Sequence, residues 1–288
     1  MRNRLAIVGI FYDGYYDMWE DFLELFSQNW PDCPYPVYIV NGNKKLEFSK
    51  DYNVTVLNAG ENAEYSKKVQ KALESIDSDY YLLLLEDFFI EKKLFKNPLI
   101  DILKSMDINH ISYLRMPMPE FLIGQKKNRF KHDNISGFDF ISNKDEYTVT
   151  CQPSIWKREF LSQCIGSENY NAWIFEGIYT YSKYAHSIEF LNKCRVCLSN
   201  PLGLRHGAVQ GKILPNVFND FKAKGYVFKN NREVLDAEKY KKHIRKQRIK
   251  GVIPRPLQQF IKKYIKSESI VDKYKEQIID IMTKMGLE

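Results

Sequence analysis

The stretch from Tyr80 to Glu91 constrains the fold more than any other part of the chain. It reads Tyr-Tyr-Leu-Leu-Leu-Leu-Glu-Asp-Phe-Phe-Ile-Glu. A short apolar run without polar alternation predicts a strand buried on both faces, as in the middle of an α/β sheet. Glu86 and Asp87 end this run, so we expect them at the sheet edge where α/β proteins bind ligands. Adjacent carboxylates repel each other and favour a cation such as Mg²⁺ or Mn²⁺, although a solvated acidic turn is the alternative.

Hydrophobic periodicity predicts alternating strands and helices around this stretch. Before it, strands are expected over residues 5–12, 37–40 and 54–57, with helices over 17–29 and 64–76. After it, the pattern predicts strands over 111–116 and 147–155, a strand or hairpin over 188–198, and helices over 98–106, 156–164, 173–184 and 271–285. Residues 117–145 are expected to be a long surface loop or a small hairpin, and residues 200–215 a loop. This order is typical of an α/β fold with a mainly parallel central sheet flanked by helices.

Several common functional classes lack their motifs here. Residues Gly9 to Gly14 do not form GxGxxG, and the chain contains neither GxxxxGK[ST] nor GxSxG. A Rossmann dinucleotide site, a P-loop and a hydrolase nucleophile elbow are therefore disfavoured. No signal peptide and no run of about 20 apolar residues is found. The five cysteines fit a reduced cytosolic setting, and the CxxC pair has no second pair at zinc-finger distance.

Positive charge is concentrated near the C-terminus. The chain carries a net charge of +7, and residues 239–266 hold eleven Lys or Arg and no acid, which leaves −4 for the remainder. An amphipathic pattern over 257–265, beside this charge, suits an anionic membrane surface. A helix packed on the main body with a solvated basic face is the alternative, and no nucleic-acid partner is expected because no such motif accompanies the patch. We therefore divide the chain into a catalytic domain, 1–232, and a basic helical C-terminal extension, 233–288.

Three segments give the chain a resemblance to GT-A fold glycosyltransferases, and within them to bacterial family 2-like polysaccharide enzymes. The first strand ends in Phe11-Tyr12-Asp13, and the Tyr80 strand ends in Glu86-Asp87. Residues 150–161, followed by Trp173-Ile174-Phe175-Glu176, resemble the acceptor-side segment of the family. The resemblance covers about residues 5–211, with one departure: the chain has Glu-Asp where the family keeps an Asp-x-Asp metal motif.

The resemblance implies roles for named residues. Phe11, Tyr12 and Asp13 would contact the nucleotide, Asp87 with Glu86 would bind Mn²⁺ or Mg²⁺, and His206 would complete that metal site. From their chemistry, Arg205 or Lys212 would pair with phosphate oxygens. Glu176 would be the general base and Trp173 would stack on the acceptor sugar. The alternatives are a first-turn helix carboxylate for Glu176, and ordinary surface or core positions for Arg205, His206 and the strand-end aromatics.

These residues together predict a glycosyltransferase, presumed inverting by resemblance, that uses a nucleotide-sugar donor and a glycan acceptor, lipid-linked in view of the basic tail. We expect it in the cytoplasm, peripheral to the inner face of the cell membrane, in surface polysaccharide synthesis. Two rivals stay open. A nucleotidyltransferase would want a Gly-rich basic loop after the first strand, and a non-catalytic GT-A-like assembly protein would tolerate the imperfect Glu-Asp motif. The sequence makes no prediction about oligomeric state.

Overall fold

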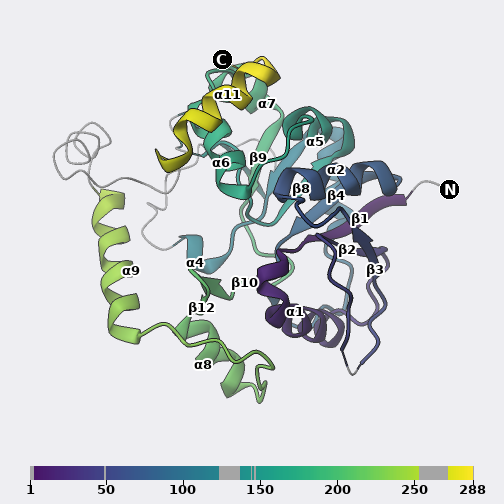
Figure 1. The fold of residues 1–288 in the computed structure, drawn as a ribbon, viewed down its shortest axis with the longest axis vertical. Coiled ribbons are helices and arrows are strands. Elements are labelled where there is room, and N and C mark those ends of the chain that lie inside the picture. Colours follow the sequence, from purple (N-terminus) through teal and green to yellow (C-terminus); the bar gives the residue numbers. More distant parts are fainter. Residues whose placement is uncertain are drawn as a thin grey trace.

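A computed structural model describes residues 3–48, 50–122, 137–143, 145, 147–252 and 272–287. Its centre is an eight-stranded sheet with the order β3-β2-β1-β4-β8-β6-β9-β7. Strands β3, β2, β1 and β4 are parallel to one another, and β6 and β9 run in the same direction. Within this sheet, β8 and β7 run against the other six strands. The expected α/β fold with a mainly parallel sheet is confirmed (Figure 1).

The strands follow the chain in an order that brings distant segments together. The main sheet consists of β1 (Asn3–Ile10), β2 (Val37–Asn41), β3 (Thr55–Asn58), β4 (Ser78–Leu84), β6 (Tyr113–Arg115), β7 (Phe138–Phe140), β8 (Ser154–Lys157) and β9 (Cys194–Cys197). Two antiparallel pairs stand apart from it: β5 (Phe88–Ile90) with β10 (Leu204–His206), and β11 (Ala208–Val209) with β12 (Lys212–Ile213). The β5–β10 pair matters for function because β5 continues directly from the end of β4.

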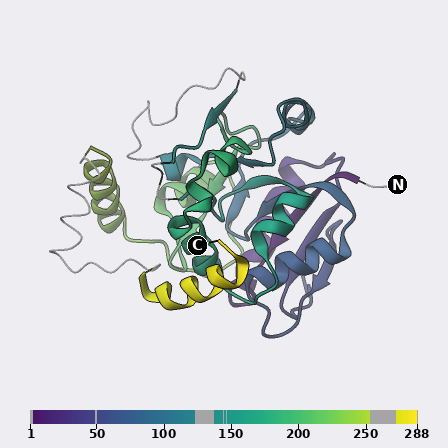
Figure 2. The ribbon, with the colours of Figure 1, turned by 90° about the horizontal axis from the view of Figure 1, so that it is seen from above.

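Helices cover both faces of the sheet (Figures 1 and 2). They are α1 (Tyr16–Asn29), α2 (Tyr65–Ser75), α3 (Leu99–Ile108), α4 (Pro119–Leu122), α5 (Arg158–Ile165), α6 (Ala172–Tyr181), α7 (Ile188–Asn192), α8 (Pro215–Ala223), α9 (Ala237–Val252) and α11 (Lys275–Met285). Short 3-10 helices η1 (Asp13–Tyr15), η2 (Tyr184–His186) and η3 (Asp272–Tyr274) complete the described elements.

The core forms two apolar layers, one on each face of the sheet. Along β1, Leu5 and Ile7 pack into the layer that contains the buried side chains of α1, α3 and α8. The alternate residues Ala6 and Val8 pack into the layer that contains those of α2, α5, α6 and α11. All four are fully buried. Because successive strand residues face opposite sides, only a continuous apolar run can fill both layers, which is the physical basis of the prediction for the β1 and β4 segments.

The second half of the chain departs from the predicted elements. The strand expected over 147–155 is β8, which begins only at Ser154 and is followed at once by α5. The segment 188–198 contains helix α7 before strand β9, because Ser187 caps a helix by accepting from Phe190 N. The expected loop over 200–215 contains β10, β11 and β12. These strands are two or three residues long, too short for periodicity to reveal.

The described residues of the C-terminal extension contact the main body. Leu235 N donates to Ile213 O, and Val234 forms a bridge with Ile213. The α11 residues Ile278, Ile281 and Met282 are buried in the core layer beside α6. Helix α9 stands at the side of the molecule (Figure 1), and its Tyr240 packs against the core layer that contains α1, α3 and α8. Within the described residues, no helix is long and apolar enough to cross a membrane. The boundary between 232 and 233 stays a prediction.

Candidate functional site

The carboxyl ends of β1 and β4 meet at one edge of the sheet. Because the two strands are neighbours and parallel, with Gly9 opposite Leu84, the residues that follow each strand leave the sheet side by side. Tyr12 N donates to Glu86 Oε2 across a distance of 3.2 Å. The predicted proximity of the acidic pair to the end of the first strand is therefore confirmed.

His206 lies against Asp87. Strand β10 pairs with β5 so that His206 is opposite Phe88, and Gly207 N donates to the backbone oxygen of Asp87 over 2.7 Å. This pairing places His206 Nε2 at 3.1 Å from Asp87 Oδ2. The sequence placed the two residues in one site by resemblance, and the β5–β10 ladder brings them together although they are far apart along the chain.

The acidic pair has more negative charge than its surroundings satisfy. Glu86 and Asp87 are 5% and 9% exposed, and burial together with the nearby Asp87 raises the pKa of Glu86 to about 8. Asp87 Oδ1 is buried and has no hydrogen-bond partner among the described residues. Buried polar oxygens are normally satisfied, so the orphaned carboxylate oxygen is one that a bound cation would satisfy.

A divalent cation fits Asp87 and His206 better than Glu86. Carboxylate oxygen and neutral imidazole are both ligands for Mn²⁺, and the orphaned Oδ1 offers a free coordination position. Glu86 Oε2 is instead engaged by Tyr12 N. Across the part of the chain that the structure describes, no three His, Cys, Asp or Glu side chains form a complete metal site. The remaining ligands would have to come from the substrate and water, as is usual for Mg²⁺ or Mn²⁺ at phosphates.

Lys68 is a site residue that the sequence reasoning missed. It is 4% exposed on α2, donates to Phe11 O over 2.9 Å, and lies 3.8 Å from Asp13 Oδ1. Burial lowers its pKa, while Asp13 and Glu86 oppose that shift. A signal was present in the sequence: Lys68 stands four residues before Ala72, on the helix face predicted to be apolar. A lysine on such a face requires a charged partner in the fold.

The three nucleotide-binding candidates at the end of β1 have different environments. The Phe11 ring is fully buried against Trp19 and Phe22, so its predicted stacking on a base is wrong. Tyr12 is 59% exposed, which leaves its ring accessible at the sheet edge. The Asp13 carboxylate accepts from Gly42 N at 2.7 Å and Asn43 N at 3.1 Å, and thereby joins the ends of β1 and β2. A base or ribose contact by Tyr12 and Asp13 stays a prediction.

Gly42 makes the approach of Asp13 possible. A Cβ added at Gly42 would lie 2.5 Å from Asp13 Oδ2, closer than any van der Waals contact permits. Only glycine allows the carboxylate to reach the two backbone donors at this turn. The Asn-Gly pair that ends β2 therefore belongs to the architecture of the site.

Glu176 lies at the same sheet edge, on α6. Strand β8 is antiparallel to β4, with Ser154 opposite Leu83, so the residues just before Ser154 lie beside the end of β4. Among them, Cys151 N donates to Glu176 Oε1 over 2.9 Å. Burial raises the pKa of the half-buried Glu176, against the Cys151 N–H and the charge of Arg115. A raised pKa suits a proton acceptor near neutral pH.

Trp173 precedes Glu176 by three residues and therefore shares its helix face. It is 44% exposed in the first turn of α6, where Asn171 caps the helix by accepting from Ile174 N at 3.0 Å. Phe175, in contrast, is fully buried against Tyr65 and Trp156. An exposed indole beside a carboxylate fits the predicted acceptor contact, which no observation here tests.

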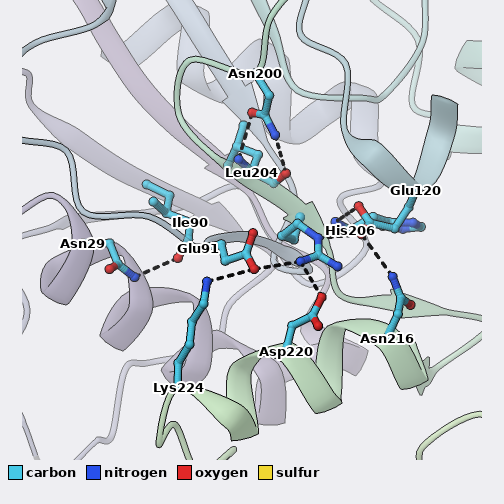
Figure 3. Close-up of polar contacts among 11 residues, drawn as sticks. Asn29, Ile90, Glu91, Glu120, Asn200, Leu204, His206, Asn216, Asp220 and Lys224 are labelled. Atoms are coloured by element: carbon cyan, nitrogen blue, oxygen red, sulfur yellow. Dashed lines mark hydrogen bonds and ion pairs between the residues drawn. The ribbon is translucent and has the colours of Figure 1, made fainter.

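The guanidinium of Arg205 contacts three carboxylates, those of Glu91, Glu120 and Asp220, which are labelled in Figure 3. Its Nε donates to Glu120 over 2.6 Å, and its Nη1 donates to Glu91 and Asp220 over 2.8 and 2.9 Å. The guanidinium is 8% exposed. Three carboxylates already balance the charge of the Arg205 guanidinium. Arg205 therefore belongs to a structural ion cluster, which replaces the predicted phosphate contact. Glu91, which follows β5, belongs to this cluster.

Arg232 contacts η1 and the segment that follows His206. Its guanidinium lies 3.9 Å from the Tyr15 ring centroid, pairs with Asp17, and donates to Gly211 O over 3.1 Å. It thereby joins η1, after β1, to the β11–β12 hairpin that follows His206. Burial raises the pKa of Tyr15, with Arg232 opposing and Asp87 reinforcing the shift, which indicates that Tyr15 lies close to the acidic pair.

Comparisons with known proteins give likenesses of low identity. No protein-family model matches the chain, and no curated protein matches it. Among solved structures, Staphylococcus aureus TarS aligns with a TM-score of 0.45 and 15% identity over 67% of this chain and 35% of its own. Residues 1–349 of TarS in complex with UDP align with a TM-score of 0.39 and 15% identity over 68% of this chain and 57% of that one.

A third neighbour is the bifunctional IspDF from Campylobacter jejuni, with a TM-score of 0.31 and 11% identity over 59% of this chain and 44% of its own. The chain thus spans between about one third and three fifths of these neighbours. The functional interpretation of the site rests on the residues and distances described above.

Proposed function

We propose that the chain is a glycosyltransferase that moves a sugar from a nucleotide-diphosphate donor to a glycan acceptor. The observation that carries the proposal is Asp87, which has an orphaned buried oxygen and contacts His206 at the sheet edge. This is the arrangement needed to receive a cation together with a diphosphate. The bound cation would supply positive charge to the leaving diphosphate.

The remaining side chains of the edge divide into a donor side and an acceptor side. Tyr12, Asp13 and Lys68 lie around the ends of β1 and β2, where a nucleotide would bind with its phosphates toward Asp87. Glu176 approaches from α6, with Trp173 beside it. Glu176 takes the proton of the acceptor hydroxyl while that oxygen attacks the anomeric carbon. Because one displacement exchanges the face of the sugar, we propose inversion of configuration.

The nucleotide site is tested by thermal unfolding with UDP, GDP, CDP and CTP, each with and without Mn²⁺. We expect one diphosphate to raise the unfolding temperature in the presence of Mn²⁺ and to do so much less in its absence. No stabilisation by any nucleotide would remove the proposal and leave the non-catalytic alternative. Release of pyrophosphate from CTP would instead indicate a nucleotidyltransferase.

Glu176→Gln tests the base. It should lower transfer by about 10²–10⁴-fold, the usual contribution of a general base, and leave donor binding nearly unchanged. The matched control is Glu159→Gln, a carboxylate in the first turn of α5. Transfer at the parent rate in Glu176→Gln would show that Glu176 is not the base.

We further propose that α9 attaches the enzyme to an anionic membrane on its cytoplasmic face and so brings it to a lipid-linked acceptor of surface polysaccharide synthesis. Helix α9 has the sequence Ala-Glu-Lys-Tyr-Lys-Lys-His-Ile-Arg-Lys-Gln-Arg-Ile-Lys-Gly-Val, and Lys241, Lys242 and Arg245 are exposed on it. Tyr240 and Ile244 are half-buried. The amphipathic pattern over 257–265 lies outside the described residues.

Liposome co-sedimentation tests this attachment. Three exposed basic residues of α9 are changed to Gln together (Lys241, Lys242 and Arg245). Since each basic residue near an anionic surface contributes about 1 kcal/mol, partitioning should fall about 10²-fold. The matched control changes three exposed lysines after β5 (Lys92, Lys93 and Lys96). Charge variants are preferable to a truncation, because α11 contributes buried side chains to the core. Equal binding of both triple variants would remove the role of α9.

A further inference from the structure

The outer edge of β10 is satisfied by side chains and not by another strand. One edge pairs with β5, and on that side Gly207 N donates to Asp87 O. On the other edge, Asn200 receives Leu204 N and donates to Leu204 O, over 2.9 and 2.8 Å. His206 N points to the same outer edge, because residues two apart in a strand direct their backbone groups alike. Figure 3 shows the two contacts between Asn200 and Leu204.

Glu120 supplies the acceptor for His206. Its Oε2 receives His206 N over 3.1 Å, while its Oε1 receives Arg205 Nε over 2.6 Å. One carboxylate therefore holds two consecutive residues of β10, one through the backbone and the other through the side chain. The Glu120 side chain is only 3% exposed, so both contacts are sheltered from water.

The cluster in turn fixes Glu120. Arg205 also binds Glu91, at the end of β5, and Asp220, on α8. Asn216 Nδ2, on α8, lies 3.4 Å from Glu120 Oε1. Four segments are thus joined around the backbone of His206, whose imidazole lies 3.1 Å from Asp87 on the inner side. A change in the Glu120 carboxylate must shift the backbone that carries the imidazole.

We infer that Glu120 is a positioning residue that holds His206 against Asp87 in the cation site. The inference rests on the proposed function for the identity of that site. It assigns a role to a residue that does not itself reach the cation. Outer partners of this kind commonly change metal affinity by about 10–100-fold, because they fix the orientation of the ligand.

The first test needs neither metal nor substrate. In protein labelled with ¹³C-histidine, the His206 resonance is identified as the one that disappears in His206→Ala. Glu120→Ala should displace that resonance and leave those of the other histidines in place. Glu120→Gln retains one acceptor oxygen and should displace it less. Asp21→Asn is the control, because Asp21, on α1, is another buried carboxylate, bound to Tyr226 and Asn230.

The second test is a double-mutant cycle on the affinity for Mn²⁺ alone, measured by electron paramagnetic resonance. We expect Glu120→Ala to weaken Mn²⁺ binding about 10-fold or more in the parent, and not to weaken it further in the His206→Ala background. A residue with only a structural role would lower the unfolding temperature without this dependence on His206.

The outcomes separate the inference from the proposed function. If the His206 resonance and the Mn²⁺ affinity keep their parent values in Glu120→Ala, the positioning role is overturned and the proposed function stands. The positioning role is also overturned if Glu120→Ala weakens Mn²⁺ binding equally with and without His206. If His206→Ala binds Mn²⁺ as tightly as the parent, the metal role of His206 fails, and the resonance test alone decides whether Glu120 positions it.

Discussion

Two neighbouring acidic clusters contain similar residue types but differ in whether their charges are paired. In one, Glu91, Glu120 and Asp220 surround Arg205, and Lys224 adds a second cation to Glu91. In the other, Asp87 contacts His206 beside Glu86, and one buried oxygen of Asp87 has no hydrogen-bond partner among the described residues. Arg205 and His206 are adjacent in β10, so their side chains leave opposite faces of the strand.

The pKa shifts express the difference between the clusters. Burial opposes ionisation of Glu91, but Lys224 and Arg205 outweigh it, and the pKa falls below its usual value. Burial raises the pKa of Glu86 to about 8, Asp87 adds to the shift, and the contacts from Tyr12 N and Lys68 do not reverse it. A cluster that satisfies its own charges stabilises the fold. A cluster that leaves carboxylate charge unpaired is a candidate site for binding a cation.

Among variants of the two clusters, Asp87→Asn is expected to give the largest effect on function. The change keeps the shape of the side chain and removes its charge, so Mn²⁺-dependent nucleotide binding should be lost. Turnover should fall about 10³-fold, the upper range for removing one electrostatic contact to the transition state. Calorimetry and steady-state kinetics measure both, with far-UV circular dichroism to confirm the fold. Normal turnover with Mn²⁺ in this variant would show that the acidic pair, like the cluster around Arg205, has only a structural role.

Arg205→Met should give the largest loss of stability. It leaves three carboxylates around an apolar side chain, and breaking a buried ion pair in this way costs about 3–5 kcal/mol. Lys224→Met is the matched control, since Lys224 is half exposed and its pair with Glu91 is expected to contribute under about 1 kcal/mol. Urea unfolding measures the free energy of each. If Arg205→Met unfolds like the parent but loses UDP binding, Arg205 belongs to the nucleotide site.

The pH dependence of stability should have opposite signs in the two clusters. The raised pKa of Glu86 means that the folded protein holds a proton that the unfolded chain loses above about pH 4.5. Stability therefore declines as pH rises from about 4.5 to 8, by about 1.4 kcal/mol per pH unit at most. Glu91, with a lowered pKa, contributes stability above about pH 4.5 that is lost on acidification through its folded-state value.

Glu86→Gln tests the first of these slopes by urea unfolding at a series of pH values. The variant should remove the decline between pH 4.5 and 8 and be more stable than the parent at pH 8. Glu91→Gln should instead lose stability at neutral pH and differ less from the parent at pH 4. A parent and a Glu86→Gln variant with parallel pH profiles would contradict the unsatisfied charge at the acidic pair.

The sequence alone determined the first half of the fold and the acidic pair. Continuous apolar runs at β1 and β4 and helical spacing in α1 and α2 are local signals, and each reflects burial that is uniform along the element. Glu86 and Asp87 could be placed at the sheet edge because they end such a run. The prediction was less accurate beyond residue 145, where strands of two to four residues carry too few side chains for a period to show.

Only the tertiary structure decided which charged residue serves which cluster. Arg205 and His206 look equally suited to phosphate or metal in the sequence, and the β5–β10 register sends His206 to Asp87 and Arg205 to Glu120. The burial of Phe11 and the contact of Lys68 with Asp13 and Phe11 O depend on helices packed from distant parts of the chain. The partners of a charged side chain are set by proximity in space. Residues that meet at a sheet edge come from distant parts of the chain, so the sequence around either residue does not identify its partner.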